Sequence, residues 1–197
     1  MSPRQPQCVH QLKITLLETK PPIWRRLQVA STINLRRLHD VIQVSMGWTQ
    51  SHLYEFRVGD VTYGEPDPDF ADMPVRSAKS THLRRVAPEA GAKLRYVYDF
   101  GDYWQHAVVV EAVQPPEPGS RYPRCLGGRR ACPPEDVGGV WGYVEFLEAI
   151  ADPQHPDHEQ MLTWSGGHFD PVAFDLAAIN AELAHLGPSP WDLFPGG

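Results

Sequence analysis

Residues 94–113 read LRYVYDFGDYWQHAVVVEAV and contain the most strand-like sequence in the chain. Residues 94–99 and 107–113 are rich in β-branched and aromatic side chains, which favour extended backbone. The segment between them contains Gly101 and Asp102, two residue types that are typical of a tight turn. The stretch therefore predicts a β-hairpin.

The N-terminal part predicts a second hairpin followed by a helix. Apolar and polar residues alternate over residues 11–17, and apolar residues recur over 23–29, as in strands with one buried face. The prolines between these strands rigidify the turn. Apolar residues then recur every three to four positions until Gly47, which is well placed to end a helix. Three residues can cap the start of this helix: Ser31, Thr32 or Asn34.

The remaining segments define the fold class. Residues 53–58 and 61–63 flank the turn-forming pair Gly59-Asp60 and predict another pair of strands. Residues 143–151, 156–164 and 170–186 have the spacing of amphipathic helices. We therefore expect an α+β fold, with a mixed or antiparallel sheet, a β-grasp-like N-terminal part and a covering of C-terminal helices.

The chain is expected to form one domain over residues 9–186, with tails at 1–8 and 187–197. Its three parts are a sheet-rich part at 9–114, a loop rich in glycine and proline at 115–139, and a helical part at 140–186. A loop of that length is expected to be either functional or tightly packed against the body.

The charge of the chain is divided unevenly along the sequence. Its 197 residues carry a net charge of −6. All 18 lysines and arginines lie in residues 1–130, whereas residues 131–197 contain 11 of the 24 acidic residues and no lysine or arginine. We therefore expect the acidic helices to pack on the basic sheet and to supply much of its counter-charge.

The sequence contains no membrane span and no secretory signal. No apolar run approaches the length that crosses a bilayer, and the first residues lack an apolar signal region. We therefore expect a cytoplasmic protein that does not bind membranes. The sequence also lacks a phosphate-binding loop, a dinucleotide fingerprint and a Gly-x-Ser-x-Gly nucleophile elbow. The motifs that usually identify several large enzyme classes are therefore missing from it.

Two segments bring together side chains that could do chemistry. The 98–106 hairpin turn contains two carboxylates, an indole and an imidazole, and the 132–139 segment adds two more carboxylates. If the segments meet, the side chains form one cleft suited to acid–base catalysis or a divalent metal. The structural alternative is that the aspartates cap turns and that the adjacent acids favour a helix N-terminus. The residues of this predicted cleft are Asp99, Asp102, Trp104, His106, Glu135 and Asp136.

Cysteine and arginine provide two weaker predictions. Cys125 and Cys132 are seven residues apart in the sequence. They are expected to be either two reduced thiols or part of a metal site together with Asp99, Asp102 and His106. Arginine pairs can bind anions or nucleic acid, although the acidic part of the chain is an equally good partner. The arginines predicted for such contacts are Arg25, Arg26, Arg36, Arg37, Arg129 and Arg130.

The order of the motifs resembles the plasmid pRiA4b ORF-3-like family over about residues 9–186. The resemblance implies a single α+β domain without an established activity, and some members carry a resolvase-like label and lie near mobile elements. This sequence lacks the separate DNA-binding segment that a serine recombinase needs. The motifs that carry the resemblance are PIWRR at 22–26, LHDVIQ at 38–43, MGW at 46–48, SHLYEF at 51–56, YDFGDYWQH at 98–106, CPPEDVGG at 132–139 and HFDP at 168–171.

Three functions are compatible with the sequence. We expect a binding or accessory module for a protein or a small molecule, without catalysis and without a cofactor. The first alternative is a metal-assisted hydrolase that uses the predicted cleft, and the second is a nucleic-acid accessory protein that uses the arginine pairs. The sequence determines neither the ligand nor the oligomeric state.

Overall fold

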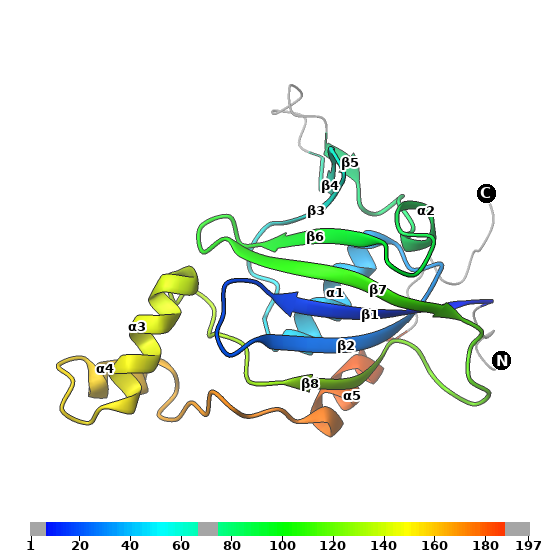
Figure 1. Ribbon diagram of the computed structural model, residues 1–197. Helices are drawn as coiled ribbons and strands as arrows, with labels where there is room; N and C mark the ends of the chain where they lie inside the picture. The colour runs from blue at the N-terminus through cyan, green and yellow to red at the C-terminus, as the bar shows by residue number, and fades with distance from the viewer. Residues whose placement is uncertain (1–6, 67–74, 188–197) are drawn as a thin grey trace.

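The hairpin predicted at residues 94–113 forms the centre of an eight-stranded sheet (Figure 1). The computed structural model describes residues 7–66 and 75–187. Strands β6 (Lys93–Tyr98) and β7 (Trp104–Gln114) pair antiparallel, and the strand order is β5-β4-β3-β6-β7-β1-β2-β8. The two strands of this hairpin therefore join the two halves of the sheet. Most of the predicted tails lie outside the described residues.

The second predicted hairpin is confirmed and lies beside β7. Strands β1 (Val9–Leu16) and β2 (Ile23–Ala30) pair antiparallel along their full length. Strand β8 (Arg124–Arg129) pairs antiparallel with β2 at the edge of the sheet. Residues 115–139 were expected to form a loop, so β8 differs from that expectation. Two glycines in its sequence weaken the local strand signal, and only pairing with β2 makes this segment extended.

The other half of the sheet extends from β6. Strands β3 (Tyr54–Val58) and β4 (Val61–Gly64) pair around the Gly59-Asp60 turn, and β3 pairs antiparallel with β6. Strand β5 (Val75–Ser77) runs parallel to β4, so the sheet is mixed, as expected. The expected strand, strand, helix, strand order is present along the chain, but β7 and β6 separate β1 from β3 in the sheet.

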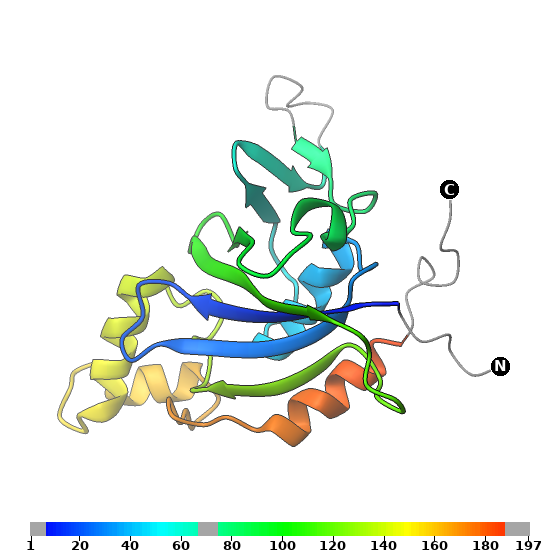
Figure 2. The same cartoon turned by 45° about the vertical axis from the view of Figure 1, so that its right-hand side comes forward.

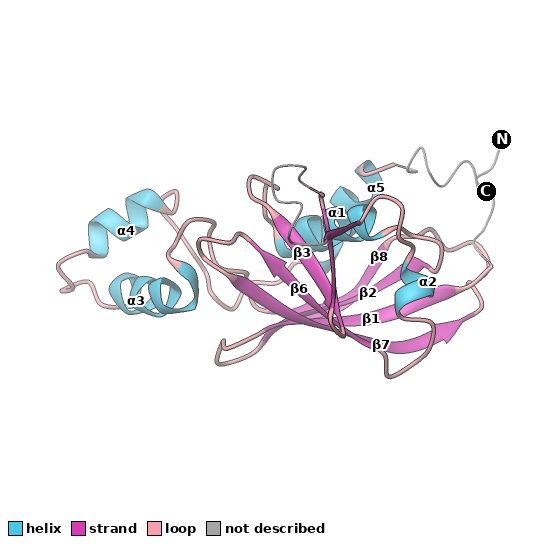
Figure 3. Cartoon of the chain, turned by 90° about the horizontal axis from the view of Figure 1, so that it is seen from above, coloured by secondary structure: helices cyan, strands magenta, loops and turns pink. Residues whose placement is uncertain are grey.

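Helix α1 (Leu35–Met46) covers one face of the sheet (Figure 3). The side chain of Asn34 accepts a hydrogen bond from the backbone N–H of Arg37 and caps the helix start. Gly47 ends the helix in the left-handed conformation, at φ +88°, which costs glycine little. The apolar face of α1 is completely buried against the strands through Leu35, Leu38, Val41 and Ile42. A short helix, α2 (Leu83–Val86), follows β5.

The C-terminal helices differ in how they meet the sheet. Helix α5 (Leu176–His185) lies along β8 and contacts α1, as Figure 2 shows, and it extends the covering of that face. Helices α3 (Gly139–Ala151) and α4 (His158–Trp164) instead pack on each other to one side, beyond the strand ends (Figures 1 and 3). Aromatic contacts hold this pair together: Phe146 contacts Tyr143, Trp164 and Phe169.

Within the described residues, the expected packing of the acidic helices on the sheet holds for α5 but not for α3 and α4, and the expected ion pairs with the basic sheet are not formed. Every lysine or arginine in an ion pair there meets an acid from the first 130 residues. The carboxylates on α3 and α4 are exposed, because these helices lie beside the sheet and turn their polar faces to water. The uneven distribution of charge along the sequence therefore does not produce ion pairs between the described lysines or arginines of the first part and the acids of the second. In the described ranges, no helix is both long and apolar enough to cross a membrane.

Candidate metal centre

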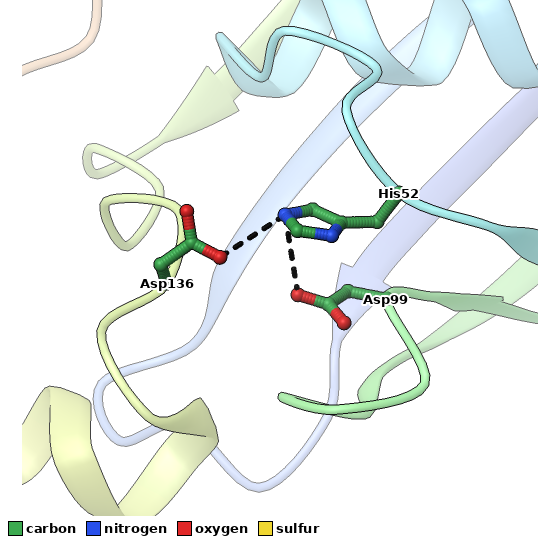
Figure 4. A group of neighbouring side chains, drawn as sticks. All are labelled: His52, Asp99 and Asp136. Atoms are coloured by element: carbon green, nitrogen blue, oxygen red, sulfur yellow. Dashed lines mark ion pairs between the residues drawn. The ribbon is translucent and has the colours of Figure 1, made fainter.

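Three segments far apart in the sequence meet at one end of the sheet. They are the 98–106 hairpin turn, the 132–139 segment before α3, and the 47–53 segment between α1 and β3. Each contributes one side chain to a cluster of His52, Asp99 and Asp136 (Figure 4). His52 Nε2 lies 3.1 Å from Asp136 Oδ1 and 3.6 Å from Asp99 Oδ2.

The hairpin turn fixes Asp99 so that its two carboxylate oxygens have different roles. Asp99 has a positive φ of 56°, and its backbone N–H donates to Leu53 O at 2.9 Å. Its Oδ1 accepts a hydrogen bond from the N–H of Gly101 at 2.8 Å, which is the turn-capping role expected for an aspartate there. The other oxygen, Oδ2, faces His52. Capping and cluster membership are therefore compatible.

Glu135 attaches the 132–139 segment to the other two segments. Its Oε1 accepts a hydrogen bond from the Tyr98 hydroxyl, and its Oε2 accepts from both the backbone N–H and the hydroxyl of Thr49. Burial, and next the bond to Glu135, raise the pKa of Tyr98, so this hydroxyl stays protonated and donates. Trp48 Nε1 also donates to the carbonyl of Pro133 at 2.9 Å. These bonds hold Asp136 next to His52.

The start of α3 packs tightly on the hairpin turn. Asp102 Oδ2 accepts a hydrogen bond from the N–H of Gly138 at 3.2 Å. Gly139 has φ +68°, and a Cβ added to it would lie 2.5 Å from the carbonyl oxygen of Asp102. Glycine is thus required at this position both by conformation and by space.

The three members of the cluster bring two carboxylates to one imidazole nitrogen. His52 Nε2 is buried and makes no hydrogen bond within the described residues, although two carboxylates face it. None of the described lysines or arginines forms an ion pair with Asp99 or Asp136. The three ligand atoms lie within 4.8 Å of one another. One imidazole nitrogen and two carboxylate oxygens are a ligand set that suits zinc, manganese or iron.

A pocket of about 660 Å³ begins at the exposed side of the cluster. Asp136, whose side chain is 69% exposed, belongs both to the cluster and to the pocket wall. Helix α4 provides most of the opposite wall. The lining residues are Asp136, Val137, Glu159, Gln160, Met161, Thr163 and Trp164.

The structure brings part of the predicted cleft together. Asp99 and Asp136 join the cluster, while Glu135 and Asp102 hold the segments in place. Trp104 and His106 lie elsewhere: both side chains are completely buried in the core, because they point to the helix-covered face of β7. The ring of His106 contacts Trp48, Tyr96 and the core around them.

The predicted metal set with cysteines is not assembled. Among the described residues, His52, Asp99 and Asp136 form the group of three possible ligands, so Asp102, His106, Cys125 and Cys132 lie outside it. Both cysteines are buried free thiols. Cys132 lies against the sulfur of Met46 at 3.0 Å, and burial raises its pKa to about 11, so it remains a neutral thiol.

Most of the predicted anion-binding arginines are engaged within the protein. Arg25 is 3% exposed and donates to backbone carbonyls, including that of Ser45. Arg26 forms two hydrogen bonds with Glu111, and both Arg36 and Arg37 pair with Asp40. The last predicted pair lies at the end of β8: Arg129 is exposed and Arg130 is half-buried.

His52 was not among the predicted site residues. It lies far from both aspartates in the sequence and outside any recognised ligand spacing, so only the fold brings it to them. The motif SHLYEF at 51–56 contained it, and the proximity of that motif to YDFGDYWQH and CPPEDVGG in space was the missing information.

These features define an α+β protein with a site built by loops at one end of a mixed sheet. The chain belongs to the plasmid pRiA4b ORF-3-like protein family, which matches residues 8–178. It is 44% identical over 179 residues to "Uncharacterized protein y4hQ" of Sinorhizobium fredii (strain NBRC 101917 / NGR234), covering 90% of this chain and 92% of that protein. It also resembles the crystal structure of MM3350, a protein of unknown function from Methanosarcina mazei Go1, with a TM-score of 0.79 and 36% identity. That match covers 87% of this chain and 97% of the other.

Proposed function

We propose that this protein is a metal-dependent binding module in which His52, Asp99 and Asp136 hold one divalent cation. The observation that carries the proposal is the buried Nε2 of His52, which makes no hydrogen bond within the described residues although carboxylate oxygens lie 3.1 Å and 3.6 Å away. A cation bound by all three groups would neutralise the carboxylates and use the imidazole lone pair.

The surroundings of the cluster support a binding role. Three protein ligands leave coordination positions free, and the pocket adjoins the cluster at Asp136. A ligand in the pocket could therefore reach the cation with an oxygen donor such as a carboxylate, a phosphate or a carbonyl group. Glu135 is unsuited to bind the same cation, because hydrogen bonds from Tyr98 and Thr49 already engage both of its oxygens.

Isothermal titration of chelator-treated protein with Zn²⁺, Mn²⁺ and Mg²⁺ tests the proposal. We expect at least one of these ions to bind with 1:1 stoichiometry and to raise the melting temperature. His52→Ala and Asp136→Asn should each weaken binding by about 100-fold or more, since even residues that only orient metal ligands contribute about 10- to 100-fold. Both side chains are partly exposed, so the variants should fold.

His155→Ala is the matched control. His155 lies 4.0 Å from Asp157 in the same acidic part of the chain and outside the cluster. Its replacement should leave metal affinity unchanged. Equal loss in the control and the cluster variants, or no binding of any of the three ions to the wild-type protein, would overturn the proposal.

Metal-assisted hydrolysis is a second candidate function, favoured by the position of Asp136. A cation with free positions beside a pocket can lower the pKa of a bound water and direct it at a ligand. Hydrolysis of phosphate esters or peptides by the metal-loaded protein, lost in His52→Ala and retained in His155→Ala, would establish it. If the protein binds metal but hydrolyses neither phosphate esters nor peptides, the hydrolase is rejected and the metal-dependent binding module remains.

A further inference from the structure

Helices α3 and α4 form an acidic surface without internal counter-charge. The sequence from residue 131 onward has no lysine or arginine, and the carboxylates of this helix pair are exposed. None of them forms an ion pair with a described lysine or arginine. Helices α3 and α4 lie beside the sheet and not over it (Figure 3). The carboxylates concerned are Glu145, Glu148, Asp152, Asp157 and Glu159.

The pocket beside α4 combines this charge with an aromatic ring and a thioether. Trp164 is 47% exposed, and its ring stands edge-to-face against Phe146 at 5.9 Å, which holds it in place. Met161 is half-buried, whereas Glu159 and Asp136 are exposed carboxylates of the pocket wall. The described lining therefore carries carboxylates, apolar groups and the neutral polar side chains of Gln160 and Thr163, and it has no lysine or arginine.

We propose that this pocket binds a lysine- or arginine-rich segment of a partner protein. A long cationic side chain has an apolar stem and a charged end, and both match this lining. Its stem packs on Met161, a residue type that adapts to varied contacts, and its charge pairs with Glu159, the pocket carboxylate that lies outside the metal cluster. The face of Trp164 adds a cation–π contact.

The size and charge of the pocket favour a segment over other occupants. A volume of about 660 Å³ is in the range of sites that enclose whole small ligands, so it accepts more than one side chain. A nucleic acid would be repelled by the uncompensated carboxylates. A second copy of this chain could offer a basic group of its own, the exposed pair Arg84-Arg85 on α2. The experiment below distinguishes a second copy from a different partner protein. The inference does not depend on the proposed cation, because Glu159, which carries the charge pairing, lies outside the cluster.

Fluorescence anisotropy with a fluorescein-labelled ten-residue peptide of alternating arginine and glycine tests the proposal. The full chain is used at low salt, with chelator present, so that failure of the metal proposal does not affect the result. We expect saturable binding that weakens steeply as salt is added, and no binding of the matched glutamate–glycine peptide. Glu159→Gln should weaken binding about fivefold, and Trp164→Phe about threefold.

Asp60→Asn is the matched control, because Asp60 is an exposed acid at the β3–β4 turn. If Asp60→Asn and Glu159→Gln weaken peptide binding equally, the peptide responds only to the net charge of the protein, and the proposal is overturned. Binding of spermine as tightly as the peptide would overturn the partner segment in favour of a small polyamine. Self-association in sedimentation experiments that is lost in Arg84→Ala/Arg85→Ala, without peptide binding, would overturn it in favour of a second copy.

Discussion

At the scale of single residues, the site is defined by which polar atoms are satisfied. Both oxygens of Glu135 accept hydrogen bonds and serve structure, whereas His52 Nε2 faces two carboxylates and makes no hydrogen bond in the described part of the chain. Buried polar groups in native proteins are normally hydrogen-bonded, so the missing hydrogen bond of this nitrogen is the observation behind the proposed cation. This contrast is the reason why the cation is proposed at His52 and not at Glu135.

Two buried histidines should make stability depend on pH. Burial lowers the pKa of His39 and of His106 to about 3, from about 6.5 in the unfolded chain. Between those values the unfolded chain binds more protons than the folded protein. The free energy of unfolding should therefore fall as pH drops from about 6.5 toward 3, by up to about 1.4 kcal/mol per pH unit for each histidine. Urea unfolding at pH 7.5, 6.5, 5.5 and 4.5 measures this slope.

His106→Leu isolates the contribution of one histidine. Neither ring nitrogen of His106 makes a well-formed hydrogen bond among the described residues, and burial outweighs the nearby backbone of Tyr96 and Trp104 in setting its pKa. An apolar side chain of similar size should therefore change the free energy of unfolding little at pH 7.5. Below pH 6.5, the free energy of unfolding of this variant should fall less steeply, by the slope that one histidine contributes. An acid slope identical to that of the wild-type protein would contradict this account.

At the scale of elements, α5 is attached to the sheet through the backbone of its edge strand. The side chain of Asn180 accepts a hydrogen bond from Cys125 N–H at 2.8 Å and donates to Cys125 O at 3.0 Å. One amide therefore satisfies both backbone groups of a residue on β8, as a neighbouring strand would. This contact explains how a short strand with two glycines is stable at an edge.

Asn180→Leu should detach α5 from β8. Both backbone groups of Cys125 would lose their partners, at a cost of about 1–3 kcal/mol in the free energy of unfolding. Hydrogen exchange at the Cys125 amide should accelerate in the folded protein, together with a lower melting temperature. Asn180→Asp keeps the acceptor and loses the donor, so it should give an intermediate effect. Unchanged exchange in Asn180→Leu would show that α5 is held by its apolar contacts alone.

At the scale of the whole molecule, the two charged parts coexist without neutralising each other. Among the described residues, the lysines and arginines in ion pairs meet acids of the same part, as Arg26 meets Glu111. Glu145→Gln and Glu148→Gln on α3 should therefore change the free energy of unfolding by less than about 0.5 kcal/mol, with no dependence on salt. Glu111→Gln should cost about 1 kcal/mol, and the cost should shrink as salt rises. Urea unfolding at low and high salt measures both.

A salt-sensitive loss of stability in the Glu145 and Glu148 variants would contradict this view. It would mean that the acidic helices do stabilise the basic sheet over longer distances.

The elements that could be predicted are those that local chemistry specifies. The two hairpins, the β3–β4 pair and helix α1 with its caps follow from residues that are neighbours in sequence, such as Asn34 and Gly47 around α1. Strand β8 escaped prediction because its extended conformation depends on β2 and on Asn180. Of the candidate metal centre, the sequence indicated Asp99 and Asp136, but not His52.

The sequence by itself determined the α+β class, the main hairpins, the first helix and the division of charge, because periodicity and turn chemistry act over a few residues. Only the tertiary structure decided that β6 and β7 lie between the two halves of the sheet and that α3 and α4 lie beside it. It also brought His52 to Asp99 and Asp136. The physical reason is that such contacts join distant segments, and their free energy comes from packing, burial and hydrogen bonds that exist only once the chain has folded.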